Sequence, residues 1–156
     1  MIIIGIDPGL SGAIAVLTDG QFTAVHDIPV VTKASGRKEV NPAELYKIIA
    51  SSMDARDVCE AVIEKVAASP QMGVSSAFSF GHSFGCCTSC VSAHSIGYVL
   101  VGPAVWKRYF KLDKEKELSR ALAIKLFPTA PLNLKKHSDR AEALLIARWL
   151  WETKYV

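Results

Sequence analysis

The chain begins with MIIIGIDPGLSGAIAVLTDG, residues 1–20, and this stretch is the most informative about the fold. Residues 1–6 are apolar except for Gly5 and show no polar alternation, which is typical of a strand covered on both faces. Asp7 follows at the end of that strand, directly before a Pro-Gly turn. Because a lone carboxylate is costly to desolvate, Asp7 either caps the turn through its side chain or binds a cation.

The composition predicts one globular domain over residues 1–156. Half of the residues are hydrophobic, there is no low-complexity tract, and the length is enough for one sizeable core. No apolar run approaches the length that spans a bilayer, and the N-terminus lacks the basic lead of a signal peptide. We therefore expect a cytoplasmic protein with reduced cysteines and no membrane partner.

The charge is unevenly distributed along the chain. The net charge is only +3, but residues 106–136 contain nine Lys or Arg and three acids, a local balance of +6 that leaves −3 for the remainder. Aromatic residues are interleaved with these cations, at Trp106, Tyr109 and Phe110. The segment favours a surface for a polyanion, and a solvated helix face is the alternative.

The order of the expected elements indicates an α/β fold. Two further strands, over residues 12–17 and 21–28, are joined by the turn Asp19-Gly20, so the first three strands form an antiparallel meander. A polar, basic loop over residues 31–40 comes next. The remaining expected elements are a helix over 41–53 (Asn41 as its cap, Pro42 at its first position), a strand over 57–66, a helix over 73–93, a strand over 97–102, and helices over 114–127 and 138–154. This order predicts a ribonuclease H-like mixed five-stranded sheet, with three antiparallel strands, then two parallel ones, and helices on both faces.

Four carboxylates fall where this fold would bring them to one edge of the sheet. Glu64 interrupts the fourth strand as Asp7 ends the first, although a salt bridge would also explain Glu64. Asp139 and Glu142 are three residues apart and share one helical face, and a capping box is the alternative for that pair. Close carboxylates need a cation to remain ionised, and oxygen ligands favour Mg²⁺ or Mn²⁺. Two such ions can clamp the attacking water and the leaving oxygen in phosphodiester hydrolysis.

A second metal site is conceivable at Cys87, Cys90 and His94, whose spacing is loosely that of zinc ligands. The segment lacks a second ligand pair and has the composition of a helix rich in small residues. We therefore expect these thiols to pack in the core.

Four segments, in this order, resemble the RuvC-type Holliday junction resolvases, in particular the shorter phage and bacterial members: GIDPGLSGAIAVL, AVIEKV, VGPAVWKRYFKLDKEKELSRALAIKLFP and DRAEALLIARW. The resemblance covers nearly the whole chain. It implies a homodimeric, Mg²⁺-dependent endonuclease that makes paired nicks across a four-way DNA junction. It also implies that Asp7, Glu64, Asp139 and Glu142 hold two metal ions, with Mn²⁺ as a substitute, and that Lys107 and Lys114 act near the scissile phosphate. DNA contacts are expected from Lys33, Arg37, Lys38, Lys107, Arg108, Lys111, Lys114 and Lys116.

The sequence departs from the family at one place. The family often has an aromatic residue just after the fourth strand that stacks on a junction base, whereas this chain has Ala67 and Ala68. Phe78 and Phe80 either replace it from the next helix or pack in the core. In the same helix, Gly81 and Gly85 are four residues apart and form our candidate for the dimer contact.

Two other functions fit parts of the pattern. The phosphate loop of actin or sugar-kinase type ATPases has the same order of a strand, an Asp, a Gly-rich turn and a second strand. Those ATPases close two lobes over the nucleotide, whereas a chain of 156 residues is long enough for only one lobe. A non-catalytic module that binds branched DNA is the other alternative, and the presence of all four acids argues against it.

Overall fold

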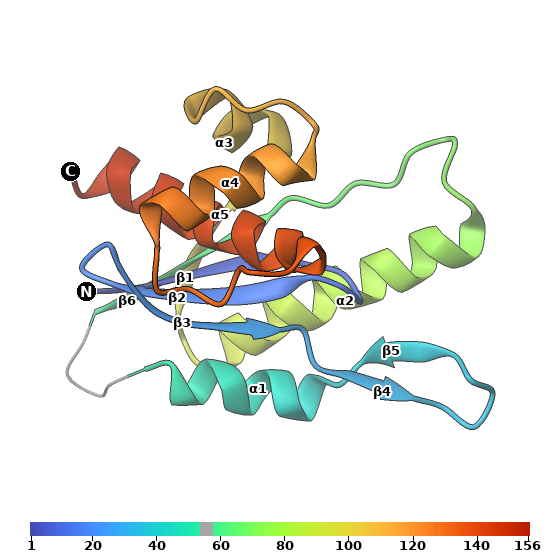
Figure 1. Cartoon of the computed structure of the whole chain (residues 1–156). Helices are drawn as coiled ribbons and strands as arrows, with labels where there is room; N and C mark the ends of the chain where they lie inside the picture. The colour runs from blue at the N-terminus through green and yellow to red at the C-terminus, as the bar shows by residue number, and fades with distance from the viewer. Residues whose placement is uncertain (54–57) are drawn as a thin grey trace.

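The structure is a computed structural model that describes residues 1–53 and 58–156. Its centre is a five-stranded mixed sheet with the order β3-β2-β1-β6-β7 (Figure 1). The strands are β1 (Ile2–Asp7), β2 (Ala13–Thr18), β3 (Gln21–Asp27), β6 (Cys59–Glu64) and β7 (Gly97–Val101). The first three pair antiparallel, and β6 and β7 continue the sheet in parallel from β1. The predicted ribonuclease H-like sheet is confirmed, and only Asp57, the first residue of the strand expected over 57–66, lies outside the described residues.

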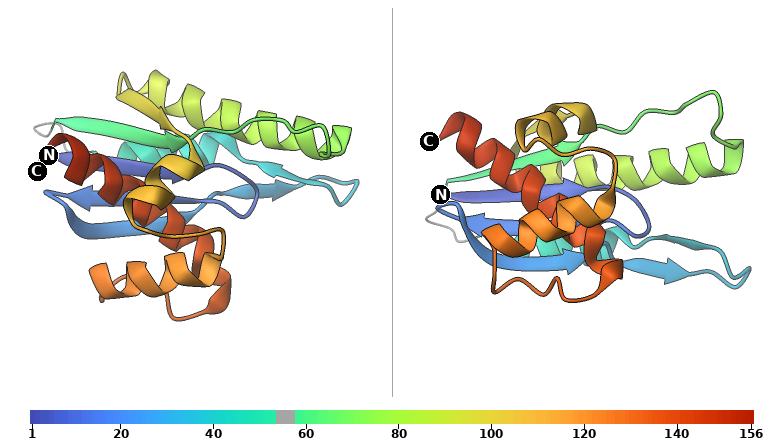
Figure 2. Two further views of the ribbon diagram at one scale, coloured as in Figure 1. Left: turned by 90° about the horizontal axis from the view of Figure 1, so that it is seen from above. Right: turned by 45° about the horizontal axis from the view of Figure 1, so that its top comes forward.

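Helices cover both faces of the sheet, as predicted (Figures 1 and 2). One face carries α1 (Pro42–Ser51) and α2 (Val74–Ala93), and the other carries α3 (Pro103–Tyr109), α4 (Lys116–Leu126) and α5 (Ser138–Lys154). Side chains of β1 alternate between the two cores: Ile3 packs on the α5 side, and Ile4 and Ile6 pack on the α1 and α2 side. This explains why β1 is apolar without alternation.

A hairpin stands in the segment that the sequence analysis assigned to a loop. β4 (Val30–Thr32) and β5 (Lys38–Val40) pair antiparallel, separately from the main sheet. Figure 1 shows the hairpin projecting beyond the sheet on the same side as the start of α2. The Arg37 guanidinium donates to the Ser75 hydroxyl at 2.8 Å, which ties the hairpin to α2. Each strand has only three residues and is little buried, so the hydrophobic pattern of the sequence does not predict the hairpin.

Gly5 allows α5 to cross directly over β1. A Cβ at this position would lie 2.4 Å from the Ala143 carbonyl oxygen and 2.7 Å from the Ala147 Cβ. Any side chain there would therefore push the helix off the strand. The close crossing brings the first turn of α5 over the carboxyl end of β1.

The cysteine-rich part of α2 contributes to the core. Cys87 and Cys90 are buried against the α1 side of the sheet, and burial raises the pKa of the Cys87 thiol to about 12. The His94 ring stacks on Tyr46 at 3.9 Å between centroids, and its Nε2 lies 3.0 Å from the Tyr46 carbonyl oxygen. These side chains are thus occupied by packing rather than gathered around a metal. Among the described helices, none is both long and apolar enough to cross a membrane.

Candidate metal centre

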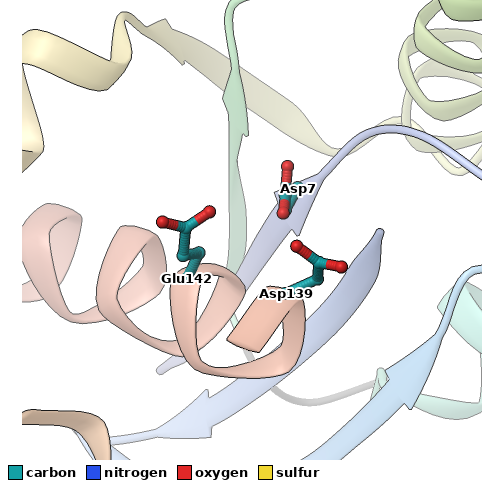
Figure 3. A group of neighbouring side chains, drawn as sticks. All are labelled: Asp7, Asp139 and Glu142. Carbon is teal, nitrogen blue, oxygen red and sulfur yellow. The ribbon is translucent and has the colours of Figure 1, made fainter. Parts of the chain in front are cut away.

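Three carboxylates converge where β1 meets α5. Oxygen atoms of Asp7, Asp139 and Glu142 all lie within 4.8 Å of one another, and Figure 3 shows the three side chains turned toward a common point. We call these three residues the acidic cluster. Asp7 is the last residue of β1. Asp139 lies in the first turn of α5 and Glu142 three residues further on, hence on the same face of the helix. The oxygen-only donor set suits Mg²⁺ or Mn²⁺.

Glu64 lines the same cleft but is held slightly apart from the cluster. Glu64 is the last residue of β6, the parallel neighbour of β1. The carboxylates at the ends of the two strands, Asp7 and Glu64, therefore lie at the same edge of the sheet. The indole N–H of Trp106, a fully buried side chain, donates to Glu64 Oε2 at 2.7 Å. The structure therefore brings all four predicted acids to one cleft, three of them within mutual reach.

The capping-box alternative for Asp139 and Glu142 does not match the structure. α5 begins at Ser138 with His137 as its N-cap, and no side chain caps the helix. Asp139 is the second residue of the helix, so its carboxylate is free to face the cleft. Both carboxylates bond to lysines instead of to the backbone of their own helix.

Two lysines neutralise the α5 carboxylates. Lys107 Nζ lies 2.9 Å from Glu142 Oε1, in a pair whose side chains are only 18% and 6% exposed and thus little screened by water. Lys116 Nζ donates to Asp139 and lies 4.0 Å from Glu142 Oε2. Ser119 also donates to Glu142, at 3.3 Å. Within the described part of the chain, the Asp7 carboxylate is the one member of the cluster with neither a hydrogen bond nor an ion pair.

Burial and the crowding of carboxylates raise the pKa values of Asp7 and Glu64. Burial raises the pKa of Asp7 well above its ordinary value of 3.8, and the charges of Glu64, Glu142 and Asp139 raise it further against the opposing charge of Lys116. Burial likewise raises the pKa of Glu64, although the hydrogen bond from Trp106 opposes the shift. A partly buried carboxylate without a partner beside other acids favours a bound cation, so the residues present fit a divalent metal.

The predicted cations fall into three groups. Arg37, Lys38, Lys107 and Lys116 line the hollow of about 780 Å³ around the acids, which we call the acidic cleft. Lys107 also lines a neighbouring hollow of about 650 Å³ together with Arg108, Lys111 and Lys114, which we call the basic hollow. Lys33 pairs with Glu39 at 2.7 Å within the hairpin. The structure thus places Lys116, rather than Lys114, beside the acidic cluster.

Two residues of the site were missed by the sequence analysis. Trp106 counted only as an aromatic residue of the basic segment, yet a buried indole needs a partner for its N–H, and that requirement was the available signal. Ser119 gave no signal, because a single serine in a helix is uninformative until the opposing helix is placed.

No family model matches the chain, and the search of curated proteins found no match. Among solved structures, RuvC of T. thermophilus in complex with a Holliday junction substrate matches with a TM-score of 0.66 at 16% identity, covering 99% of this chain and 96% of that one. The chain has the RuvC fold. A second structure of Thermus thermophilus RuvC matches with a TM-score of 0.58 at 16% identity over 98% of this chain and 96% of that one. The RuvC-like ribonuclease H fold agrees with the resemblance read from the four sequence segments.

Proposed function

We propose that this chain is a metal-dependent endonuclease that resolves four-way DNA junctions. The observation that carries the proposal is the convergence of Asp7, Asp139 and Glu142 at the sheet edge of a RuvC-like fold, in a cleft that cations also line. Carboxylates alone would repel DNA, and cations alone would only bind it. Their combination suits hydrolysis of a phosphodiester.

The acidic cluster, with Glu64, would hold the metal ions, Mg²⁺ or its substitute Mn²⁺, two to each site. Bound there, such ions supply an activated water and stabilise charge on the leaving 3′ oxygen. Trp106 orients Glu64 through its indole N–H. Lys107 binds a phosphate oxygen and offsets the developing negative charge, and Lys116, beside the acids, is better placed than Lys114 for the same task. The products carry 5′-phosphate and 3′-hydroxyl ends, which a ligase can reseal.

DNA would approach the acidic cleft between two basic elements. Arg37 and Lys38 of the hairpin line one part of the cleft, and Lys107 and Lys116 line another. Contacts of this kind to phosphates set affinity and are weakened by salt. Junction binding is therefore expected to persist when an acid of the cluster is neutralised.

A homodimer suits the two-fold symmetry of a four-way junction, which presents two equivalent phosphates. Gly81 and Gly85 of α2 remain our candidate contact. A Cβ at either position would meet nothing within 4 Å, so this helix face does not pack on its own chain. Bulky residues there should be tolerated by the monomer but not by a close dimer. Replacing both glycines with Leu should give a monomeric mass by light scattering and convert paired nicks into single ones.

The proposal is tested on a synthetic junction with each of its four strands labelled in turn. With Mg²⁺, we expect nicks at symmetrical positions in two opposite strands, and DNA ligase should reseal them. Equal cutting of a plain duplex, cutting in the presence of chelator, or ends that ligase does not seal would contradict the proposal.

A non-catalytic junction-binding module is the second candidate. The lysines on Asp139 and Glu142 favour it, because they neutralise these acids without a metal. Such a module would bind the junction with the same affinity with and without Mg²⁺, and would leave all four strands intact.

A further inference from the structure

The basic hollow lies beside the metal centre and is lined by four cations. Lys107, Arg108, Lys111 and Lys114 surround it, with Asp113 as the one acid. All come from α3 and the turn that follows it. Lys107 lines both this hollow and the acidic cleft, so the two spaces are adjacent.

Three of the four cations of the basic hollow are not neutralised by their surroundings, whereas Lys107 pairs with Glu142. Arg108, Lys111 and Lys114 are exposed and have no ion pair or side-chain hydrogen bond within residues 1–53 and 58–156. The Asp113 carboxylate accepts the backbone N–H of Glu115 at 2.7 Å, which turns it toward its own chain. The hollow therefore presents unpaired positive charge, which attracts an anion.

Lys111 occupies a backbone position that favours glycine. Its φ is +56°, in the left-handed region. The Leu112 N–H bonds the Lys107 carbonyl at 2.8 Å, and the Lys111 N–H bonds the Arg108 carbonyl at 3.1 Å, the two bonds of a Schellman motif that ends α3. Glycine adopts this conformation without strain, whereas a lysine is strained there. Among the described residues, Asp19 and Ser95 are the other non-glycine residues with a positive φ. Backbone strain of this kind clusters at functional sites, and Lys111 alone of the three lines a cationic hollow beside the acidic cluster.

We infer that the basic hollow binds the DNA backbone phosphate next to the one that is cut, and that Lys111 is kept at its strained position for this contact. A strand with one phosphate at the acidic cluster would pass over Lys107, which faces both spaces, and enter the hollow. Pro103 and Ala104 add carbon surface on which a deoxyribose can lie. The inference rests on the proposed function, since it takes its ligand to be the strand held at the metal centre.

The decisive variant is Lys111→Gly, because it removes the charge and relieves the strain together. We expect an unchanged or higher thermal midpoint. We also expect junction affinity to fall roughly three- to tenfold near 0.1 M salt, with a shallower dependence of log affinity on log salt by about 1. Lys111→Asn, which tolerates the left-handed region, should lose affinity similarly. Lys125→Gln is the matched control, since it removes one exposed positive charge of α4 that lines neither space.

Affinity is measured in chelator, so the result does not depend on cutting. Wild-type affinity and salt dependence in Lys111→Gly would overturn the inference even if the wild type nicks junctions. A lower midpoint in that variant would also overturn it, because Lys111 would then be structural. Conversely, a wild type that never nicks junctions would overturn the proposed function. In that case, weaker junction binding by both Lys111 variants would still show that the basic hollow binds DNA.

Discussion

Lys116 donates to the Asp139 carboxylate and lies 4.0 Å from Glu142, so one ammonium contacts both α5 acids of the acidic cluster. Its positive charge lies beside two of the carboxylates that would hold a divalent ion. We therefore predict that Lys116→Gln binds Ca²⁺ or Mn²⁺ several-fold more tightly, measured by calorimetry without DNA. Without metal, the same variant should unfold at a lower temperature, because the carboxylates lose their counter-charge.

Lys114→Gln is the control for this prediction, since Lys114 lines the basic hollow and has no partner in the described part of the chain. It should change neither metal affinity nor the midpoint. Equal or weaker metal binding by Lys116→Gln would mean that Lys116 does not compete with the metal.

The raised pKa of Asp7 leads us to predict a specific dependence of folding stability on pH. Its pKa in the folded protein is raised well above 3.8 by burial and by three neighbouring carboxylates, so the folded protein holds that proton more tightly than the unfolded chain does. The stability that protonation provides is complete below about pH 4 and is lost as pH rises through the raised pKa. Without metal, Asp7→Asn should therefore be more stable than the wild type at neutral pH, by about 3 °C for each kcal/mol gained.

Thermal melts in chelator between pH 4 and pH 8 measure this effect. The difference between Asp7→Asn and the wild type should shrink as the pH falls. A difference that stays constant over this range would show that the Asp7 carboxyl is not crowded.

The bond between Trp106 and Glu64 predicts a loss of activity from a buried substitution. Trp106→Phe removes the only hydrogen-bond donor to Glu64 that the described residues provide, and leaves a gap in the core. We expect a loss of about 2 kcal/mol in unfolding free energy and a fall of about tenfold or more in the nicking rate. Trp149→Phe, at a partly buried position on the same face of the sheet, should lose stability but keep the rate per folded molecule. Equal rates for the two variants would show that the Trp106 hydrogen bond does not position Glu64 for the reaction.

Gly5 links the fold to the site. Gly5→Ala places a methyl group 2.4 Å from the Ala143 carbonyl oxygen, so α5 must move and carry Asp139 and Glu142 away from Asp7. We expect a loss of about 1–3 kcal/mol in stability and weaker metal binding. Gly97→Ala is the control, since a Cβ there meets nothing within 4 Å. Denaturant melts and calorimetry should separate the two variants, and equal metal affinity would contradict the link.

The sheet and the acids were predictable because short-range patterns specify them. Apolar runs marked β1 and β6, and a charge at the end of each run marked Asp7 and Glu64. The lysine beside the acids was not predictable in the same way, because it depends on where α4 begins. The helix starts at Lys116, two residues after the expected position, and helix ends cannot be read from sequence to that accuracy. The hairpin and the bond from Trp106 depend on contacts between distant segments, which leave no local pattern.

In the proposed function, the acidic cluster cuts junction DNA with a metal ion. The most direct measurement is the nicking of a synthetic four-way junction with Mg²⁺, by the wild type and by Asp7→Asn side by side, with junction binding measured for both. We predict Mg²⁺-dependent nicks from the wild type and none from Asp7→Asn, with binding retained in both proteins. Intact strands with the wild type, or equal nicking by Asp7→Asn, would contradict the account.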